Sequence, residues 1–199
     1  MKKIALSSLV ALFAISSANA ATNYFVGGST AVKLDDDHAT LVSVAPEFGW
    51  KVDSRWDLGL AAHFGYDHKY LPTEYGMDGE TYAYGAGVFA RYKVGQLGGV
   101  KLLLKGSVGA DFTTYDPEDS DVDAETTTSL NAAIIPMITY DLTESFTLYA
   151  QLNFLGVYAG YTFENEDLDQ KAGWNMGAFA DADNVANTKN FQIGFTYNF

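Results

Sequence analysis

The three histidines and the serines are the residues of this chain that could support nucleophilic chemistry. A serine activated by a neighbouring histidine is a common way to attack an ester, and His63 and Ser107 are the pair that the chain's pattern places on one face. The strands expected below separate this pair by one further strand, which puts it about 10 Å apart at about 4.8 Å per strand. His38 and His68 lie in connecting segments with no nearby serine or second ligand. We therefore predict that the protein is not an enzyme and that His63 is a structural residue.

The acidic segment DPEDSDVDAE is a second candidate for chemistry, because it places six carboxylates in ten residues. It lacks the glycine that an EF-hand loop needs for its turn, so it is not a calcium loop of that kind. The plain interpretation is a solvated loop whose charges repel one another. The sharper hypothesis is weak contact with divalent cations through Asp119, Asp121, Asp123 and Glu125. No cofactor is expected, and the absence of cysteine excludes thiol and zinc–thiolate sites.

The elements that must position these residues follow a period of two, which is the period of a strand with one apolar face. The final nine residues, FQIGFTYNF, alternate bulky apolar and polar side chains. The uncharged stretch 145–163 approaches the length of about 20 residues that a membrane helix needs, but its polar residues fall on alternate positions. Seven segments keep the period: 42–50, 56–66, 84–94, 100–112, 130–140, the segment that begins at Phe146, and 191–199. An eighth, glycine-rich segment over 23–32 completes the set.

The connections between these segments distinguish a barrel from a sandwich. Short turns near Ser54, Leu97 and Thr143 alternate strictly with long links over 33–39, 67–80, 116–129 and 162–190. Such an alternation is typical of an up-and-down meander with all tight turns at one end. The sequence therefore predicts an all-β fold, an eight-stranded antiparallel up-and-down transmembrane β-barrel.

Charge and aromatic residues distinguish the two ends of this barrel. The long links hold 19 of the 25 acidic residues, whereas basic residues flank the short turns. Aromatic residues on the apolar face form two groups, as in the girdles of membrane barrels. The group near the short turns consists of Trp50, Trp56, Tyr92, Tyr140, Phe146, Tyr197 and Phe199. The group near the long links consists of Tyr66, Tyr82, Tyr84, Phe112 and Tyr158.

The first twenty residues have the pattern of a secretory signal peptide. Lys2 and Lys3 precede an apolar run over 4–15, and Ala18-Asn19-Ala20 ends the segment with small residues. We expect cleavage after Ala20, which leaves residues 21–199 as one barrel domain. That domain carries 10 basic and 25 acidic residues, so nucleic acid is not an expected partner.

On the signal, the eight-strand meander and the terminal aromatic strand, the chain resembles the small outer-membrane β-barrel family that includes OmpX, OmpW and the membrane domain of OmpA. The resemblance implies a bacterial outer-membrane location, with the long acidic loops outside the cell. It also implies that Phe195, Tyr197 and Phe199 form the C-terminal signal read by the barrel-assembly machinery. Because the chain ends at Phe199, we expect no cell-wall-binding domain of the kind that full-length OmpA carries.

The interior of an eight-stranded barrel is just wide enough for side chains to fill. Inward positions combine bulky residues with glycines and with three charges, Glu47, Arg91 and Lys105. Unpaired charges there would be very costly, so we predict that Glu47 pairs with Arg91 or Lys105; the alternative is separate, solvated charges. The other inward residues of this predicted plug are Phe89, Leu103, Ile135, Met137, Tyr149, Leu155, His63, Gln151 and Asn153.

The expected function is a structural or surface-exposed outer-membrane protein with a mostly plugged lumen. The alternative is a narrow porin-like or OmpW-like channel for small or hydrophobic molecules. Expected partners are outer-membrane lipid, lipopolysaccharide and the assembly machinery. Divalent cations would bridge the acidic loop to lipopolysaccharide. The protein itself is expected to be a monomer. Within the last long link, we expect the stretch GWNMGAF to extend a hairpin or cap the mouth. Its side chains Trp174, Met176 and Phe179 are expected to pack on the loop; the alternative is a contact surface for a partner.

Overall fold

The computed structural model of the chain describes residues 23–34, 40–68, 79–117, 124–165, 170–180 and 191–199. These residues form strands, and no helix among them is long and apolar enough to cross a membrane. The strands are β1 (Tyr24–Leu34), β2 (Thr40–Lys51), β3 (Trp56–His68), β4 (Gly79–Leu97), β5 (Val100–Pro117), β6 (Glu125–Asp141), β7 (Phe146–Leu152), β8 (Leu155–Thr162), β9 (Gly173–Ala180) and β10 (Phe191–Asn198).

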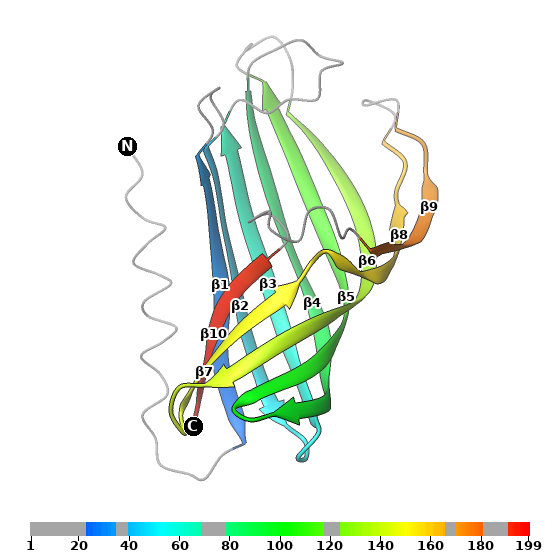
Figure 1. Cartoon of the computed structure of the whole chain (residues 1–199). Coiled ribbons are helices and arrows are strands. Elements are labelled where there is room, and N and C mark those ends of the chain that lie inside the picture. The colour runs from blue at the N-terminus through cyan, green and yellow to red at the C-terminus, as the bar shows by residue number, and fades with distance from the viewer. Residues whose placement is uncertain (1–22, 35–39, 69–78, 118–123, 166–169, 181–190) are drawn as a thin grey trace.

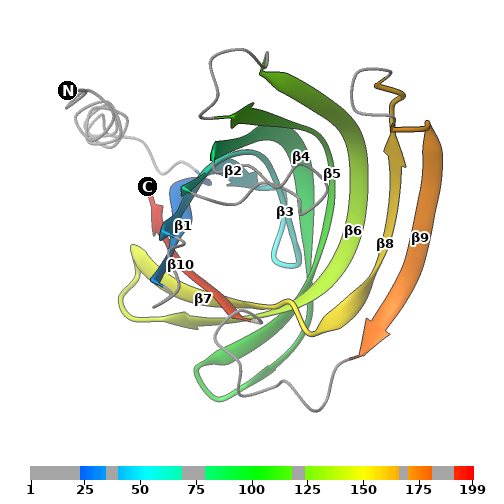
Figure 2. The ribbon, with the colours of Figure 1, turned by 90° about the horizontal axis from the view of Figure 1, so that it is seen from above.

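Eight of the strands close into an antiparallel barrel, which confirms the predicted fold class. Strands β1 to β7 pair in sequence order, and β10 pairs with both β7 and β1, so the ring has no free end (Figures 1 and 2). The tight turns between β2 and β3, β4 and β5, and β6 and β7 lie at one end of the barrel. The C-terminus lies at the same end, where Asn198 donates a backbone hydrogen bond to Ser145 in the last of these turns.

The two faces of the strands follow the predicted alternation. Trp50 and Leu104, predicted to face outward, are exposed, while Phe89, Met137 and Tyr149 are buried inside. The glycine-rich first strand, whose facing the sequence left open, turns Phe25 inward and Tyr24 outward. Strands β4 and β5 run for 19 and 18 residues, well past the predicted segments 84–94 and 100–112, because their polar ends continue to pair beyond the apolar belt.

The predicted single strand that begins at Phe146 is broken into β7 and β8. Gln151 of β7 pairs with Met137 of β6, and Val157 of β8 pairs with Ile134 of β6. Between these two pairs, β6 runs for three residues, whereas the chain from β7 to β8 runs for six. An odd excess of three residues reverses the alternation. The prediction that Leu155 faces inward is therefore wrong: it is 43% exposed on the outer face.

Because of the same reversal, Tyr158 does not belong to the predicted group of outward-facing aromatic residues near the long links. In β8 the outer face is formed by Leu155, Val157, Ala159 and Tyr161, which pair with or adjoin the outward residues of β6. Tyr158 lies on the opposite face, opposite Gly177 of β9, whose missing side chain leaves room for the tyrosine ring.

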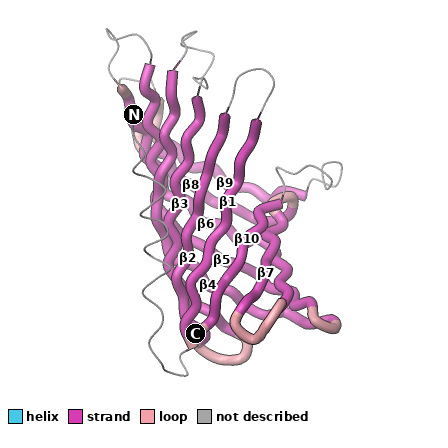
Figure 3. Tube along the Cα trace, turned by 90° about the vertical axis from the view of Figure 1, so that its left-hand side faces the viewer, coloured by secondary structure: helices cyan, strands magenta, loops and turns pink. Residues whose placement is uncertain are grey.

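Strands β8 and β9 form a hairpin that leaves the ring beside β6 (Figure 2). Strands β7 and β10 complete the wall only near the short turns and are shorter than β1 to β5 (Figure 3). The stretch expected to extend a hairpin does so as β9. The prediction that Trp174 and Met176 pack on the loop is wrong, because they are 75% and 72% exposed. The side chain of Phe179 lies outside the described residues.

Candidate functional site

Three aromatic rings fill the lumen in the half of the barrel near the short turns, and each lies across from a glycine. Phe25 pairs in register with Gly49, Phe89 with Gly59, and Tyr149 with Gly194. A Cβ added to any of these glycines would come within about 2.4 Å of the facing ring. The glycines therefore create the room that the rings occupy, as the sequence predicted for bulky and small inward positions.

Arg91 lies at the centre of these rings. Its guanidinium carbon is 4.7 Å from the ring centre of Phe89, 5.1 Å from that of Phe25 and 5.4 Å from that of Tyr149. A guanidinium over an aromatic face is attracted by the ring's quadrupole, and more strongly where water is excluded. The rings thus hold the cation in place on several sides.

Glu47 lies between Arg91 and Lys105, so the structure brings together all three charges that the sequence placed in the lumen. Arg91 Nη2 donates to one carboxylate oxygen of Glu47 and Lys105 Nζ donates to the other. Glu47 and Arg91 are each only 4% exposed. A carboxylate that accepts from two cations is satisfied without water, whereas any one of the three charges alone would be strongly unfavourable.

Register explains why these three residues meet. Arg91 and Lys105 are direct cross-strand partners on β4 and β5. Glu47 comes from β2, and its partner on β3 is Ala61, a small residue that leaves space across the intervening strand. The net charge of the cluster is positive, and the Arg91 Nε atom has no hydrogen-bond partner among the described residues.

A polar cavity of about 180 Å³ opens below this cluster at the short-turn end. Lys51, Asp57, Lys101 and Asp141 line it, and Arg91 and Tyr149 form its inner end. Lys101 Nζ donates to Asp141, whose other oxygen accepts from Thr147 Oγ1 at 2.8 Å.

The half of the lumen near the long links is polar and more open. His63 Nε2 lies 3.3 Å from Asp111 Oδ1, with the two side chains 40% and 32% exposed. Asn131 Nδ2 donates to the other oxygen of Asp111 and, at 3.0 Å, to Ser129 Oγ. His63 and Asp111 reach each other across β4 because Gly85 stands between them, and a Cβ there would meet both side chains at 2.4 Å.

Sequence reasoning missed the His63–Asp111 pair, because it treats His63 as a lone histidine. The signal is the glycine at position 85, but it can be used only once the register of three strands is known. Ser107 does not join the pair: it aligns with Phe89 and Ala133, four residues along β5 from Asp111.

The other predicted site residues fall into two groups. Asp119, Asp121 and Asp123 lie outside the described residues, and Glu125 begins β6 opposite Tyr115. Across the described ranges, no group of three or more histidine, aspartate or glutamate side chains is placed to hold a metal ion. At the C-terminus, Phe195 stacks on Phe146 at 5.4 Å, and the rings of Tyr197 and Phe199 are 5.1 Å apart.

Two solved structures resemble this chain over most of its length. One is Neisserial surface protein A, with 16% identity, a TM-score of 0.50, and coverage of 91% of this chain and 100% of that one. The other is a major outer membrane protein of Thermus thermophilus, also with 16% identity and a TM-score of 0.50, and with coverage of 90% of this chain and 100% of that one. By fold, the chain is a small outer-membrane β-barrel.

This barrel also matches Ail, the attachment invasion locus protein of Yersinia pestis, at 12% identity and a TM-score of 0.41, over 88% of this chain and 96% of Ail. No protein-family model matches the chain, and no curated protein matches it. At 16% identity, the likeness to the first two structures establishes the fold of the barrel and leaves its activity to be argued from the site.

Proposed function

We propose that the protein is an integral outer-membrane barrel with a structural or surface-exposed role, a closed lumen and acidic loops outside the cell. The observation that carries this proposal is the cluster of Glu47, Arg91 and Lys105, enclosed by Phe25, Phe89 and Tyr149. A lumen occupied by buried ion pairs and rings offers no continuous path for water or solutes.

The orientation in the membrane follows from the two ends. The end of the barrel with the short turns carries Lys51, Arg55 and Lys93 and would face the periplasm, together with the C-terminus. The long links would then lie outside, where their carboxylates could reach lipopolysaccharide through divalent cations. Phe195, Tyr197 and Phe199 would serve as the signal for the assembly machinery, and the protein would work as a monomer without catalytic activity.

A narrow channel is the second candidate, and one observation favours it. The polar cavity at the short-turn end already penetrates as far as Arg91. If the cluster could shift, this cavity would become the vestibule of a path for small molecules.

Conductance of the refolded residues 21–199 in a planar lipid bilayer separates the two functions. We expect no steady openings from the natural sequence, and openings from a Phe25→Ala/Phe89→Ala variant that removes two rings of the plug. Phe64→Ala, which shortens an exposed ring on the outer face of β3, is the matched control. Steady openings of the natural sequence would contradict the closed lumen and establish the channel.

A further inference from the structure

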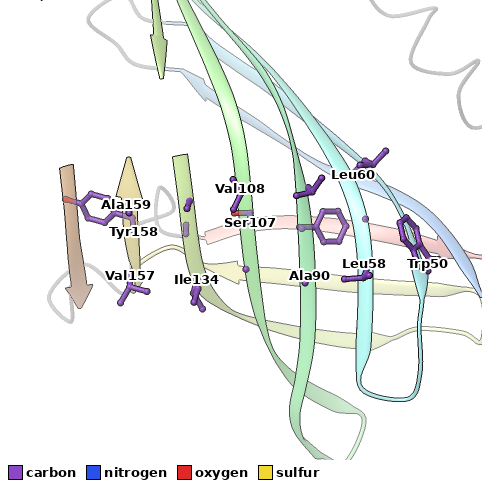
Figure 4. A pocket seen from close by; sticks show the side chains of 16 residues that line it. Trp50, Leu58, Leu60, Ala90, Ser107, Val108, Ile134, Val157, Tyr158 and Ala159 are labelled. Atoms are coloured by element: carbon purple, nitrogen blue, oxygen red, sulfur yellow. The ribbon is translucent and has the colours of Figure 1, made fainter. Parts of the chain in front are cut away.

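The outer wall of the barrel has an apolar groove of about 750 Å³ that the closed-lumen function does not use. It runs from Trp50 at the end of β2 across the outward faces of β3, β4, β5, β6 and β8 (Figure 4). Small residues form its floor, since Ala90 pairs with Gly106 and Ala132 pairs with Ala159. Larger side chains border it, among them Leu58, Leu60, Val108 and Ile134.

The groove owes its depth to two features described above. The first is Gly106, where a Cβ would meet nothing within 4 Å, so the floor is open at its middle. The second is the reversal between β7 and β8, which turns Val157 and Ala159 to the outer face and makes β8 part of the groove. The depth of the groove therefore depends both on the glycine at position 106 and on the position of β8, which leaves the ring with β9.

A cation lies at the end of this groove that is nearest the short turns. Leu58 and Ala90 form one cross-strand pair, and Trp56 and Tyr92 form the next, about 7 Å nearer the turn at about 3.4 Å per residue. The rings of Trp56 and Tyr92 pack at 4.8 Å, and Arg55 Nη1 donates to the Tyr92 hydroxyl at 3.3 Å. Arg55 is exposed and also borders the polar cavity, so its charge lies at the water interface.

We propose that this groove binds one anionic phospholipid, with an acyl chain along Ala90, Gly106 and Ala132 and the phosphate at Arg55. The proposal rests on the proposed function, because it requires the short turns to lie at a membrane interface. Charge complementarity selects this occupant: a guanidinium pairs well with a phosphate, and the aromatic pair beside it has the composition of a membrane interface. The remainder of the groove is apolar and matches a hydrocarbon chain.

The test is native mass spectrometry of the refolded chain in detergent micelles with added palmitoyl-oleoyl phosphatidylglycerol. We expect one lipid to remain bound to the natural sequence. Gly106→Leu fills the groove from its floor, where an added Cβ would meet nothing within 4 Å, and should weaken retention at least fivefold. Gly95→Leu is the matched control, because Gly95 on β4 also has nothing within 4 Å of an added Cβ and does not line the groove.

The headgroup is tested separately with Arg55→Gln, which should weaken retention several-fold. Ala90→Leu fills the same groove from β4 and is used if Gly106→Leu does not refold. Retention by Gly106→Leu or Arg55→Gln equal to that of the natural sequence would overturn the proposal. So would equal loss with Gly95→Leu, or a dimer that Gly106→Leu dissociates, which would assign the groove to a second copy of the chain.

Failure of this proposal can be told apart from failure of the proposed function. Each variant is checked for the change in gel migration on heating that reports a folded barrel. A natural sequence that shows no such change would contradict the membrane barrel itself, whereas a folded barrel that releases its lipid contradicts the groove alone.

Discussion

The two halves of the lumen are built from the same strands but differ in what lies inside them. Near the short turns, rings and paired charges exclude water around Arg91. Near the long links, His63, Asp111 and Asn131 form a hydrogen-bonded group that stays partly exposed. The alternation of inward and outward residues is common to both halves, so alternation alone does not determine whether a barrel is closed.

The partner of each glycine accounts for the difference. In the half near the short turns, Gly49 and Gly59 face aromatic rings, and the space that they leave is filled by apolar atoms. In the other half, Gly85 lies between a histidine and a carboxylate, and the space is used for a polar contact. At Gly49, Gly59 and Gly85 the missing side chain makes room for a larger neighbour, and the chemistry of that neighbour differs between the two halves of the lumen.

The largest expected effect is from Glu47→Gln, which leaves Arg91 and Lys105 buried without their shared carboxylate. Breaking a buried ion pair by removing one partner costs about 3–5 kcal/mol. We expect a loss of that size in the free energy of unfolding, measured by urea titration in detergent micelles with tryptophan fluorescence.

Replacing all three charges with methionine should recover most of the stability lost in Glu47→Gln, because apolar side chains of similar volume remove the unpaired charges. A loss below about 1 kcal/mol in Glu47→Gln would mean that water reaches the cluster, and the contrast between the two halves would disappear.

An intermediate effect is expected from Gly59→Ala. The added Cβ would lie 2.4 Å from Phe89 Cζ and 2.6 Å from the Phe48 carbonyl oxygen, and overpacking of this kind costs about 1–3 kcal/mol. Gly65→Ala on the same strand is the control, because its Cβ would meet Ala83 Cβ at an ordinary 3.5 Å. The same urea titration should show a change within about 0.5 kcal/mol for Gly65→Ala. Equal effects at the two positions would contradict the packing difference.

The smallest effect is expected from His63→Ala. Its contact with Asp111 is partly exposed, and pairs of this kind contribute about 0–1 kcal/mol. Unfolding in urea should therefore shift only slightly, in contrast to Glu47→Gln. A loss above about 2 kcal/mol would show that the half near the long links is packed as firmly as the other.

Much of the fold could be predicted from the sequence because a period of two is a strong local signal. Seven of the eight strands of the ring and the inward position of Glu47, Arg91 and Lys105 follow from it, and the alternation of short and long connections then requires the eighth strand. What could not be predicted depends on how neighbouring strands align. The rings of Phe25, Phe89 and Tyr149 around Arg91, and the His63–Asp111 pair, require cross-strand register, which a single sequence does not contain.

The errors have one common cause. The alternation places Leu155 and Tyr158 on the wrong faces because it continues through Asn153 and Phe154, where the structure has a turn. The exposed positions of Trp174 and Met176 depend on the same turn, because it allows β8 to leave the ring and carry β9 with it.

Because the number of extra residues between β7 and β8 is odd, removing one residue there and removing two should have different effects on the fold. Removing one residue between Leu152 and Leu155 would turn the β8–β9 hairpin over, presenting Gly156 and Gly160 to the outside and hiding Val157 and Ala159. Removing two would preserve the orientation and merely tighten the bend. Length variation at this point should therefore be accepted in steps of two.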